Sequence, residues 1–147
     1  PPARKPETRN PKPSLSKTRQ PAAGALVLGP LGRHPAGELL QRFHAALQAG
    51  NIAGVAGSFA PDARMNSLRG RDEIADHFRT GLIPADSRQV NLKVLRLGRE
   101  DGGWRVEADL NVRVDRSDGR ENLLSGRGSF LLAGSGDQLL ITRMEIE

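Results

Sequence analysis

The feature that most constrains the fold is residues 104–115, where apolar and polar side chains alternate without a break. The apolar positions are Trp104, Val106, Ala108, Leu110, Val112 and Val114, and the polar positions are Arg105, Glu107, Asp109, Asn111, Arg113 and Asp115. Successive side chains of a β-strand point to opposite faces, so this segment predicts a long strand with one buried face. Such a strand needs an antiparallel sheet around it and a second layer over its apolar face.

Helical periodicity precedes this strand. Apolar side chains recur with a period near 3.6 from Pro35 to Gly50, from Asn51 to Phe59, and from Asp72 onward. Gly50 suits a helix end, because glycine accepts the left-handed geometry found there, and Asn51 suits the cap of the next helix. Further strands are expected at about 63–68, 90–97, 120–133 and 138–147. The pattern predicts an α+β fold with three N-terminal helices packed on a curved antiparallel sheet.

The strand expected around residue 94 changes its parity. Val90, Leu92 and Val94 alternate with polar residues, but Leu95 and Leu97 continue on the opposite parity. An extra residue within a strand makes a β-bulge, which bends the sheet. We therefore expect a bulge at this point.

Composition divides the chain at about residue 35. Residues 1–35 hold eight of the ten prolines and have seven basic side chains against one acidic side chain, whereas residues 36–147 have 15 basic and 16 acidic ones. We interpret 1–35 as a flexible, basic, Pro-rich linker and 36–147 as one folded domain, the C-terminal module of a larger bacterial protein. The linker has no aromatic side chain on which a base could stack, so a nucleic-acid partner is not expected. The alternative is contact with an anionic surface.

Several classes of site and location find no support in the sequence. Without cysteine there are neither disulfides nor thiolate metal sites, and we expect no metal and no cofactor. No apolar run approaches the roughly 20 residues of a membrane span, and none reads clearly as a signal peptide. The compartment stays open between cytoplasm and periplasm.

Four short patterns, in order and spacing, carry a resemblance to a known family. They are Leu-Gln-Arg-Phe, Ala-Leu-Gln-Ala-Gly-Asn, Phe-Ala-Pro-Asp-Ala and Gly-Arg-Asp-Glu-Ile, within residues 39–82. Together they resemble the nuclear transport factor 2-like superfamily, which includes the ketosteroid isomerases and SnoaL-like cyclases. The resemblance implies a cone-shaped sheet around an apolar pocket, and often a dimer formed through the outer face of the sheet.

The same resemblance argues against isomerase chemistry. The isomerases need a Tyr and a protonated Asp to stabilise an enolate and a second Asp as base. The aligned positions here hold Phe43, Gly128 and Ser67, and the chain contains no tyrosine. A phenyl ring donates no hydrogen bond, and a serine without an adjacent base does not abstract a proton from carbon at neutral pH.

Other candidate residues each have two interpretations. A cone pocket would be lined by Phe43, Phe59, Met65, Ser67, Phe78, Trp104 and Gly128, although large apolar side chains more often form plain core. Asp109, Arg113 and Asp115 match the residue types of the epoxide hydrolase relatives, but their parity predicts an outward position. His44 and His77 each adjoin a core phenylalanine, so we expect them at the edge of the core rather than at a metal.

Two functions follow as expectations. The first is a non-catalytic protein-interaction or assembly module, a homodimer through the sheet face formed by Arg105, Glu107, Asp109, Asn111, Arg113 and Asp115. The alternative is a domain that binds a small molecule in the cone, or a cyclase-like or hydrolase-like enzyme. A cavity with polar groups converging inside would favour the alternative.

Overall fold

A computed structural model describes residues 24–100, 102–134 and 138–147. The elements in chain order are β1 (Leu26–Val27), the short 3₁₀ helix η1 (Gly29–Leu31), α2 (Pro35–Ala49), α3 (Ile52–Gly57), β2 (Phe59–Met65), β3 (Leu68–Arg69), α4 (Arg71–Leu82), β4 (Ser87–Glu100), β5 (Gly103–Arg116), β6 (Gly119–Ala133) and β7 (Leu140–Ile146).

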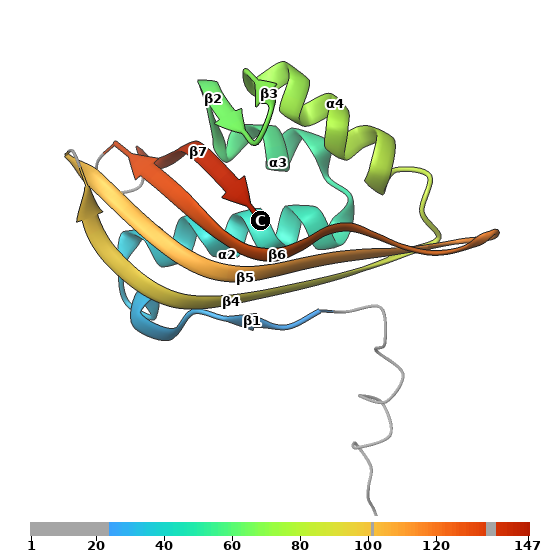
Figure 1. Cartoon of the computed structure of the whole chain (residues 1–147), viewed down its shortest axis with the longest axis horizontal. Helices are drawn as coiled ribbons and strands as arrows, with labels where there is room; N and C mark the ends of the chain where they lie inside the picture. The colour runs from blue at the N-terminus through green and yellow to red at the C-terminus, as the bar shows by residue number, and fades with distance from the viewer. Residues whose placement is uncertain (1–23, 101, 135–137) are drawn as a thin grey trace, which may run out of the picture.

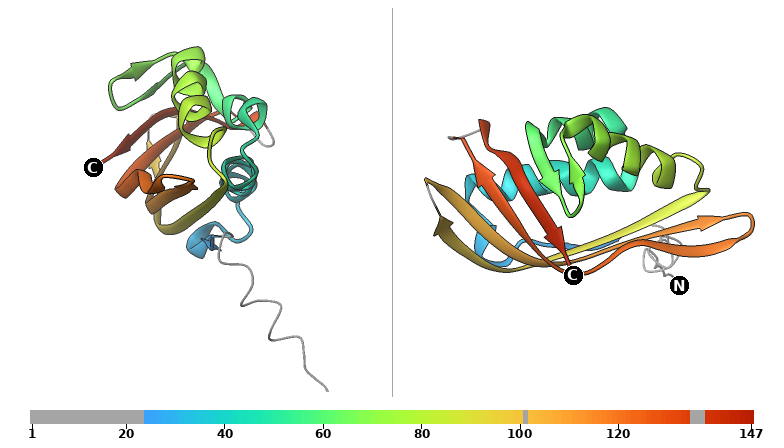
Figure 2. Two further views of the ribbon diagram at one scale, coloured as in Figure 1. Left: turned by 90° about the vertical axis from the view of Figure 1, so that its right-hand side faces the viewer. Right: turned by 45° about the horizontal axis from the view of Figure 1, so that its top comes forward.

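The architecture is α+β, in two layers. One sheet has the strand order β1-β4-β5-β6-β7-β2-β3. It curves into a trough, and α2, α3 and α4 lie along its concave side (Figures 1 and 2). The hairpin of β5 and β6 reaches beyond the helices at one end of the trough (Figure 1).

The sheet is mixed, which corrects the expectation of a wholly antiparallel one. β4, β5, β6 and β7 are antiparallel neighbours, as alternation predicted. However, β1 runs parallel to β4, and β2 runs parallel to β7. Both parallel pairs join segments that are far apart in sequence. Residue alternation indicates a strand but not its partner, so the sequence could not reveal these pairs.

The predicted bulge is confirmed. Val94 pairs with Ala108 and Arg96 pairs with Glu107, so Leu95 is the extra residue on β4. On β5, the apolar parity from Val106 to Val114 is buried against the helices, and the alternating polar side chains lie on the outer face. The side chains of β5 therefore face the two sides of the sheet as the alternation in residues 104–115 predicted.

The helix ends also follow the sequence. Gly50 ends α2 in the left-handed conformation, with φ of 69°. The side chain of Asn51 caps α3 by accepting a hydrogen bond from the backbone N–H of Gly54 at 3.1 Å. A further contact was not foreseen: the Arg88 guanidinium on β4 donates to the backbone carbonyls of Gln48 and Leu82, at 3.1 and 3.0 Å. Arg88 thus links the C-terminal ends of α2 and α4.

Two boundaries differ from the prediction. The strand expected at 63–68 is a hairpin of β2 and β3, whose turn contains Asn66 with φ of 52°. The folded part also begins earlier than residue 36, because β1 pairs with β4 and Leu31 is fully buried. An apolar stretch broken by Gly and Pro resembles a linker in composition, but here it packs on the sheet. The rest of the predicted linker, 1–23, lies outside the described residues.

Candidate functional site

The space between the helices and the sheet is filled by four phenylalanine rings. Phe43 of α2 is central, and its ring centroid lies 5.6 Å from Phe59, 6.4 Å from Phe78 and 6.2 Å from Phe130, each in edge-to-face geometry. All four side chains are 0% exposed. Such edge-to-face contacts stabilise a closely packed core.

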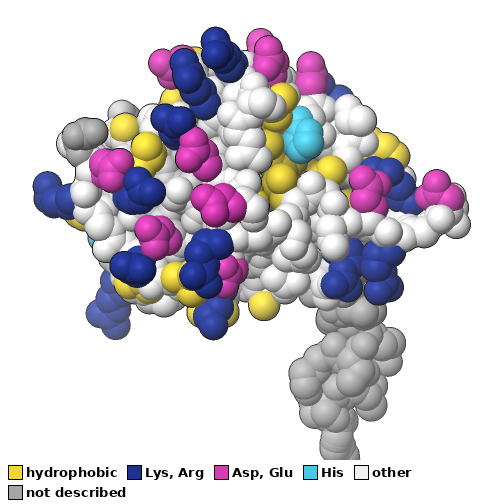
Figure 3. Space-filling model, viewed as in Figure 1, with side chains coloured by type: hydrophobic (Ala, Val, Ile, Leu, Met, Phe, Trp, Pro, Cys, Tyr) yellow, Lys and Arg dark blue, Asp and Glu magenta, His cyan; other side chains and the backbone are white. Residues whose placement is uncertain are grey.

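An open groove lies beside this core, between α4 and the hairpin of β5 and β6. We call it the α4 groove; its volume is about 590 Å³, and it is lined by Leu68, Glu73, Asp76, His77, Thr80, Gly81, Arg116, Glu121 and Leu123. Figure 3 shows apolar surface around a histidine in the part of the molecule that α4 occupies. Six of its nine lining residues carry polar or charged side chains, and Leu68 and Leu123 supply apolar surface.

Packing between α4 and β6 forms the floor of the α4 groove. A side chain at Gly81 would place its Cβ 2.5 Å from Leu123, so glycine lets the helix rest directly on that leucine. Arg116 reaches across from β5. Its guanidinium donates to the Gly81 carbonyl at 3.2 Å and to the Glu121 carboxylate at 2.9 Å. These contacts hold the arginine in a fixed position on the groove wall.

His77 and Arg116 are the distinctive polar groups of the groove. His77 Nε2 and Arg116 Nε are both buried, and neither has a hydrogen-bond partner among the described residues. Burial lowers the pKa of His77 below its usual value, because desolvation disfavours the charged imidazolium. His77 is therefore neutral at pH 7.

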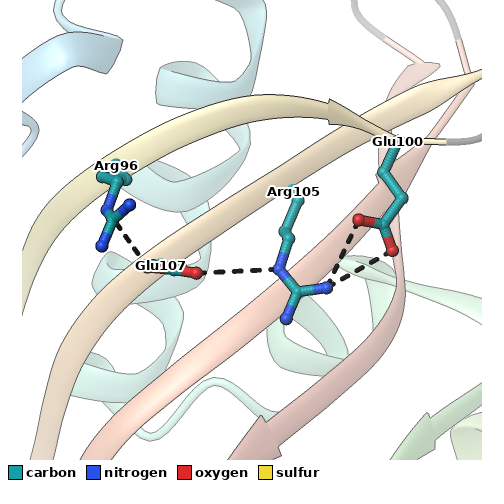
Figure 4. A network of polar contacts seen from close by, with 4 residues as sticks. All are labelled: Arg96, Glu100, Arg105 and Glu107. Atoms are coloured by element: carbon teal, nitrogen blue, oxygen red, sulfur yellow. Dashed lines mark hydrogen bonds and ion pairs between the residues drawn. The ribbon is translucent and has the colours of Figure 1, made fainter.

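The outer face of the sheet carries a ladder of charges. The six polar residues predicted for it, Arg105 to Asp115 on alternate positions, are half-buried there. Figure 4 shows one network, in which Glu107 lies 3.4 Å from Arg96 and Arg105 lies 3.3 Å from Glu100. A second pair joins Arg127 to Asp109 at 3.0 Å, which raises the pKa of Arg127. Opposite charges are thus interspersed over three strands, β4, β5 and β6.

Solved structures establish what the fold is. No protein-family model matches the sequence, and no curated protein matches it either. A protein from Novosphingobium aromaticivorans named as a candidate scytalone dehydratase superposes with a TM-score of 0.69 at 11% identity, over 81% of this chain and 85% of that one. A protein from Catenulispora acidiphila superposes with a TM-score of 0.62 at 21% identity, over 77% and 88%. Aln2 from a Streptomyces species gives 0.62 at 17%, over 77% and 87%.

The chain has the nuclear transport factor 2-like fold. The resemblance drawn from the four short patterns is thereby supported at the level of the fold. At these identities the similarity carries no further conclusion about activity.

Within this nuclear transport factor 2-like fold, the positions aligned with the isomerase groups lie apart. Phe43 is in the core, whereas Ser67 is exposed in the turn between β2 and β3, not in a strand as expected. Gly128 lies on β6, and a Cβ there would lie 2.2 Å from the Cδ1 atom of Ile146, which covers it. The patterns aligned Ser67 in sequence, but the tight turn at Asn66 directs it to solvent.

The other predicted pocket residues also lie outside the α4 groove. Met65 is buried in the core. Trp104 is half-buried at the corner between η1 and α2, where its ring contacts His34 edge-to-face at 4.4 Å and lies under Arg99 at 4.9 Å. None of the seven predicted pocket residues lines the α4 groove.

Asp109, Arg113 and Asp115 occupy the outer face, as their parity predicted, and so do not converge in the interior. Hydrogen bonds from Arg120 at 2.8 Å and Ser87 at 2.9 Å lower the pKa of Asp115. These contacts tie the β5–β6 hairpin, close to its turn, to the start of β4. They are structural contacts at the surface, and the trio does not form a buried hydrolytic site.

The histidines have separate environments. His44 Nε2 donates to the Val90 carbonyl at 2.8 Å, and His34 Nδ1 accepts the Ala36 N–H at 3.0 Å at the start of α2. Among the described histidines, His77 alone contributes an unpartnered buried nitrogen to a groove. Sequence reasoning placed His77 at the edge of the core, next to Phe78, which is fully buried.

Metal clusters and membrane-spanning helices are both absent from the described ranges. No group of three or more His, Cys, Asp or Glu side chains there could hold a metal ion. No helix in these ranges is long and apolar enough to cross a membrane.

Proposed function

We propose that this domain is a non-catalytic association module, and that two copies pair through the outer faces of their sheets. The observation that carries the proposal is the division of β5, with apolar side chains filling the interior and charged ones ordered outside. A core closed by phenyl rings offers no group for catalysis. The outer face carries interspersed charges of both signs, which make it self-complementary.

The charge pattern supports a symmetric pair. In a two-fold interface the same patch meets itself, so each Arg of one copy must find an acidic group of the other. Arg105, Arg127, Glu107 and Asp109 alternate across neighbouring strands and meet this condition. Their present intrachain pairs are exposed and contribute little, so exchanging them for pairs between copies costs little.

A charge reversal tests the association. Sedimentation equilibrium of the wild-type chain should give a dimer whose dissociation increases with salt, because exposed charge pairs are screened. Arg127→Glu should shift the population to monomer, since it places an acidic group beside Asp109. The matched control is Arg79→Glu, an exposed arginine of α4 that lies away from the sheet and pairs with Asp76.

The outcomes are distinct. Dissociation in Arg127→Glu with an unchanged dimer in Arg79→Glu supports pairing through the sheet. A wild-type chain that stays monomeric at every concentration overturns the proposal. Equal effects of the two variants would place the contact elsewhere and would also overturn it.

A further inference from the structure

A short N-terminal segment, residues 24–34, covers one edge of the sheet, and we name it the strap. Its strand β1 runs along β4 at that edge (Figure 1). The pairing is parallel and joins Leu26 with Leu92 and Val27 with Lys93. A ladder this short is weak by itself, so the contacts at the two ends of the strap decide how readily it opens.

The two ends of the strap are held by polar contacts of different kinds. At the first end, the amide oxygen of the Gln48 side chain accepts the backbone N–H of Gly24 at 3.0 Å. At the second end, Leu31 is fully buried and His34 caps α2, because its Nδ1 accepts the backbone N–H of Ala36 at 3.0 Å. Of these two polar contacts, only the one made by His34 depends on a titratable group.

The cap made by His34 requires a neutral imidazole. Nδ1 can accept a hydrogen bond only while it carries no proton, and a second ring proton turns it into a donor that faces the N–H of Ala36. Histidine is the side chain that changes its charge between about pH 8 and pH 5. The cap therefore contributes to holding the strap at neutral pH, and this contribution is lost as the pH falls.

The charged groups around His34 do not replace the lost cap. Arg33 precedes it in the chain, and the N-terminus of α2 carries a partial positive charge. The His34 ring meets Trp104 of β5 edge-to-face at 4.4 Å, and the Arg99 guanidinium of β4 lies over the same indole at 4.9 Å. Glu38 of α2 lines the same hollow, but it is exposed and its attraction is screened. The charged ring thus has no buried acidic partner among the described residues.

We propose that His34 is a pH-sensitive switch, and that its second ring proton loosens the strap from β4. In the closed form, the backbone N–H of Leu92 donates to the Ala25 carbonyl at 2.9 Å, and opening removes that acceptor. The uncovered strand edge can then accept another strand, so the proton controls how often this edge is available. The switch lies at the edge of the sheet and does not depend on the association proposed above.

Amide hydrogen exchange of the full chain, followed by nuclear magnetic resonance, tests the switch. The amides of Ala25 and Leu92 report on the strap, whereas the amide of Ile141, which donates to the Ser58 carbonyl, reports on β7. Protection is compared after correction for the intrinsic pH dependence of exchange. Between about pH 7.5 and pH 5, protection of the strap amides should fall about tenfold relative to Ile141, because a helix cap is worth roughly that factor.

Matched variants identify the group that titrates. His34→Asn keeps a strong capping side chain that does not titrate, so its strap amides should change by less than about twofold over the same range. His34→Ser is a second capping variant in case His34→Asn does not fold. The control is His44→Gln: His44 Nε2 donates to the Val90 carbonyl at 2.8 Å, and a donor survives protonation, so this variant should keep the wild-type response.

Three results would overturn the proposal. The first is constant protection of the strap amides in the wild-type chain. The second is an equal loss of protection at Ile141, which would mean that acid opens the whole domain. The third is an undiminished response in His34→Asn or His34→Ser, which would assign the pH dependence to another group.

Discussion

His77 and Phe78 are consecutive residues of α4, yet they face two different regions. Phe78 is fully buried against Phe43, in a core where every ring has ring neighbours. His77 lines the α4 groove, where two nitrogen atoms lack partners among the described residues and space remains. One helical step therefore separates the buried core from an open groove at the surface.

The core and the groove therefore contribute differently to this fold. Filling the interior with phenyl rings gives a large gain from burial and edge-to-face contact. The groove beside the core has mostly polar lining residues instead. Substitutions on the two sides should therefore differ in both size and kind.

The largest effect is expected in the core. Phe43→Ala removes the ring that contacts Phe59, Phe78 and Phe130, so a cavity replaces several ring contacts. The free energy of unfolding should fall by about 3–5 kcal/mol, measured by urea denaturation. A loss below about 1 kcal/mol would show that the core collapses freely around Phe43.

A smaller loss is expected when the isomerase-type residue is restored in the core. Phe43→Tyr places a hydroxyl among phenyl rings without a partner, and this should cost about 1–3 kcal/mol in the same assay. Ser67→Asp is the matched control, because Ser67 is exposed and should tolerate the change within about 0.5 kcal/mol. If Phe43→Tyr were neutral, a concealed acceptor would have to lie near the ring.

The effect of substituting His77 on stability should depend on pH more than on the volume of the new side chain. The folded pKa of His77 is lowered by burial, so the folded chain binds fewer protons than the unfolded chain as pH falls below about 6.5. His77 therefore makes no difference above that pH and destabilises the fold as pH falls toward its lowered pKa. Urea midpoints between neutral and mildly acidic pH should fall less in His77→Gln than in wild type. Parallel curves for the two chains would contradict this assignment.

The smallest effect on folding is expected on the outer face. Arg127→Ala removes the ion pair with Asp109; the Arg127 side chain is 67% exposed and that of Asp109 is 47% exposed. The free energy of unfolding should therefore change by less than about 1 kcal/mol. Thermal denaturation at low concentration would measure this. A larger loss would mean that the outer face supports the fold itself and not only contacts between copies.

Much of the fold could be predicted from side-chain periodicity. The alternation around Leu110 indicated the buried and outer faces of β5, and the parity change at Leu95 indicated the bulge. Gly50 and Asn51 indicated the break between α2 and α3, because their backbone preferences act locally. Such features depend on neighbouring residues, which a sequence displays directly.

The candidate site could not be predicted in the same way. The groove is formed by α4, β3, β5 and β6, and its shape depends on Gly81 resting on Leu123. His77 Nε2 and Arg116 Nε are buried without a hydrogen-bond partner among the described residues. The spacing of apolar residues in a sequence does not indicate whether a side chain finds such a partner. The prediction for Ser67 was wrong for a related reason. Ser67 was expected in a strand, but it lies with Asn66 in the turn between β2 and β3, where its side chain is exposed.

The parallel pairing of β2 with β7 has a consequence for the order in which the chain can fold. Phe59 is paired with Ile141, so this contact closes a loop of most of the described chain. Pairings of such long sequence separation slow folding, because the loop entropy is lost before the contact forms. Phe59, Met65 and the helices can collapse early, but β2 has no neighbour for its parallel edge until β7 arrives. We therefore expect the docking of β7 to be the last and rate-limiting step, with β2 available until then for mispairing with another chain.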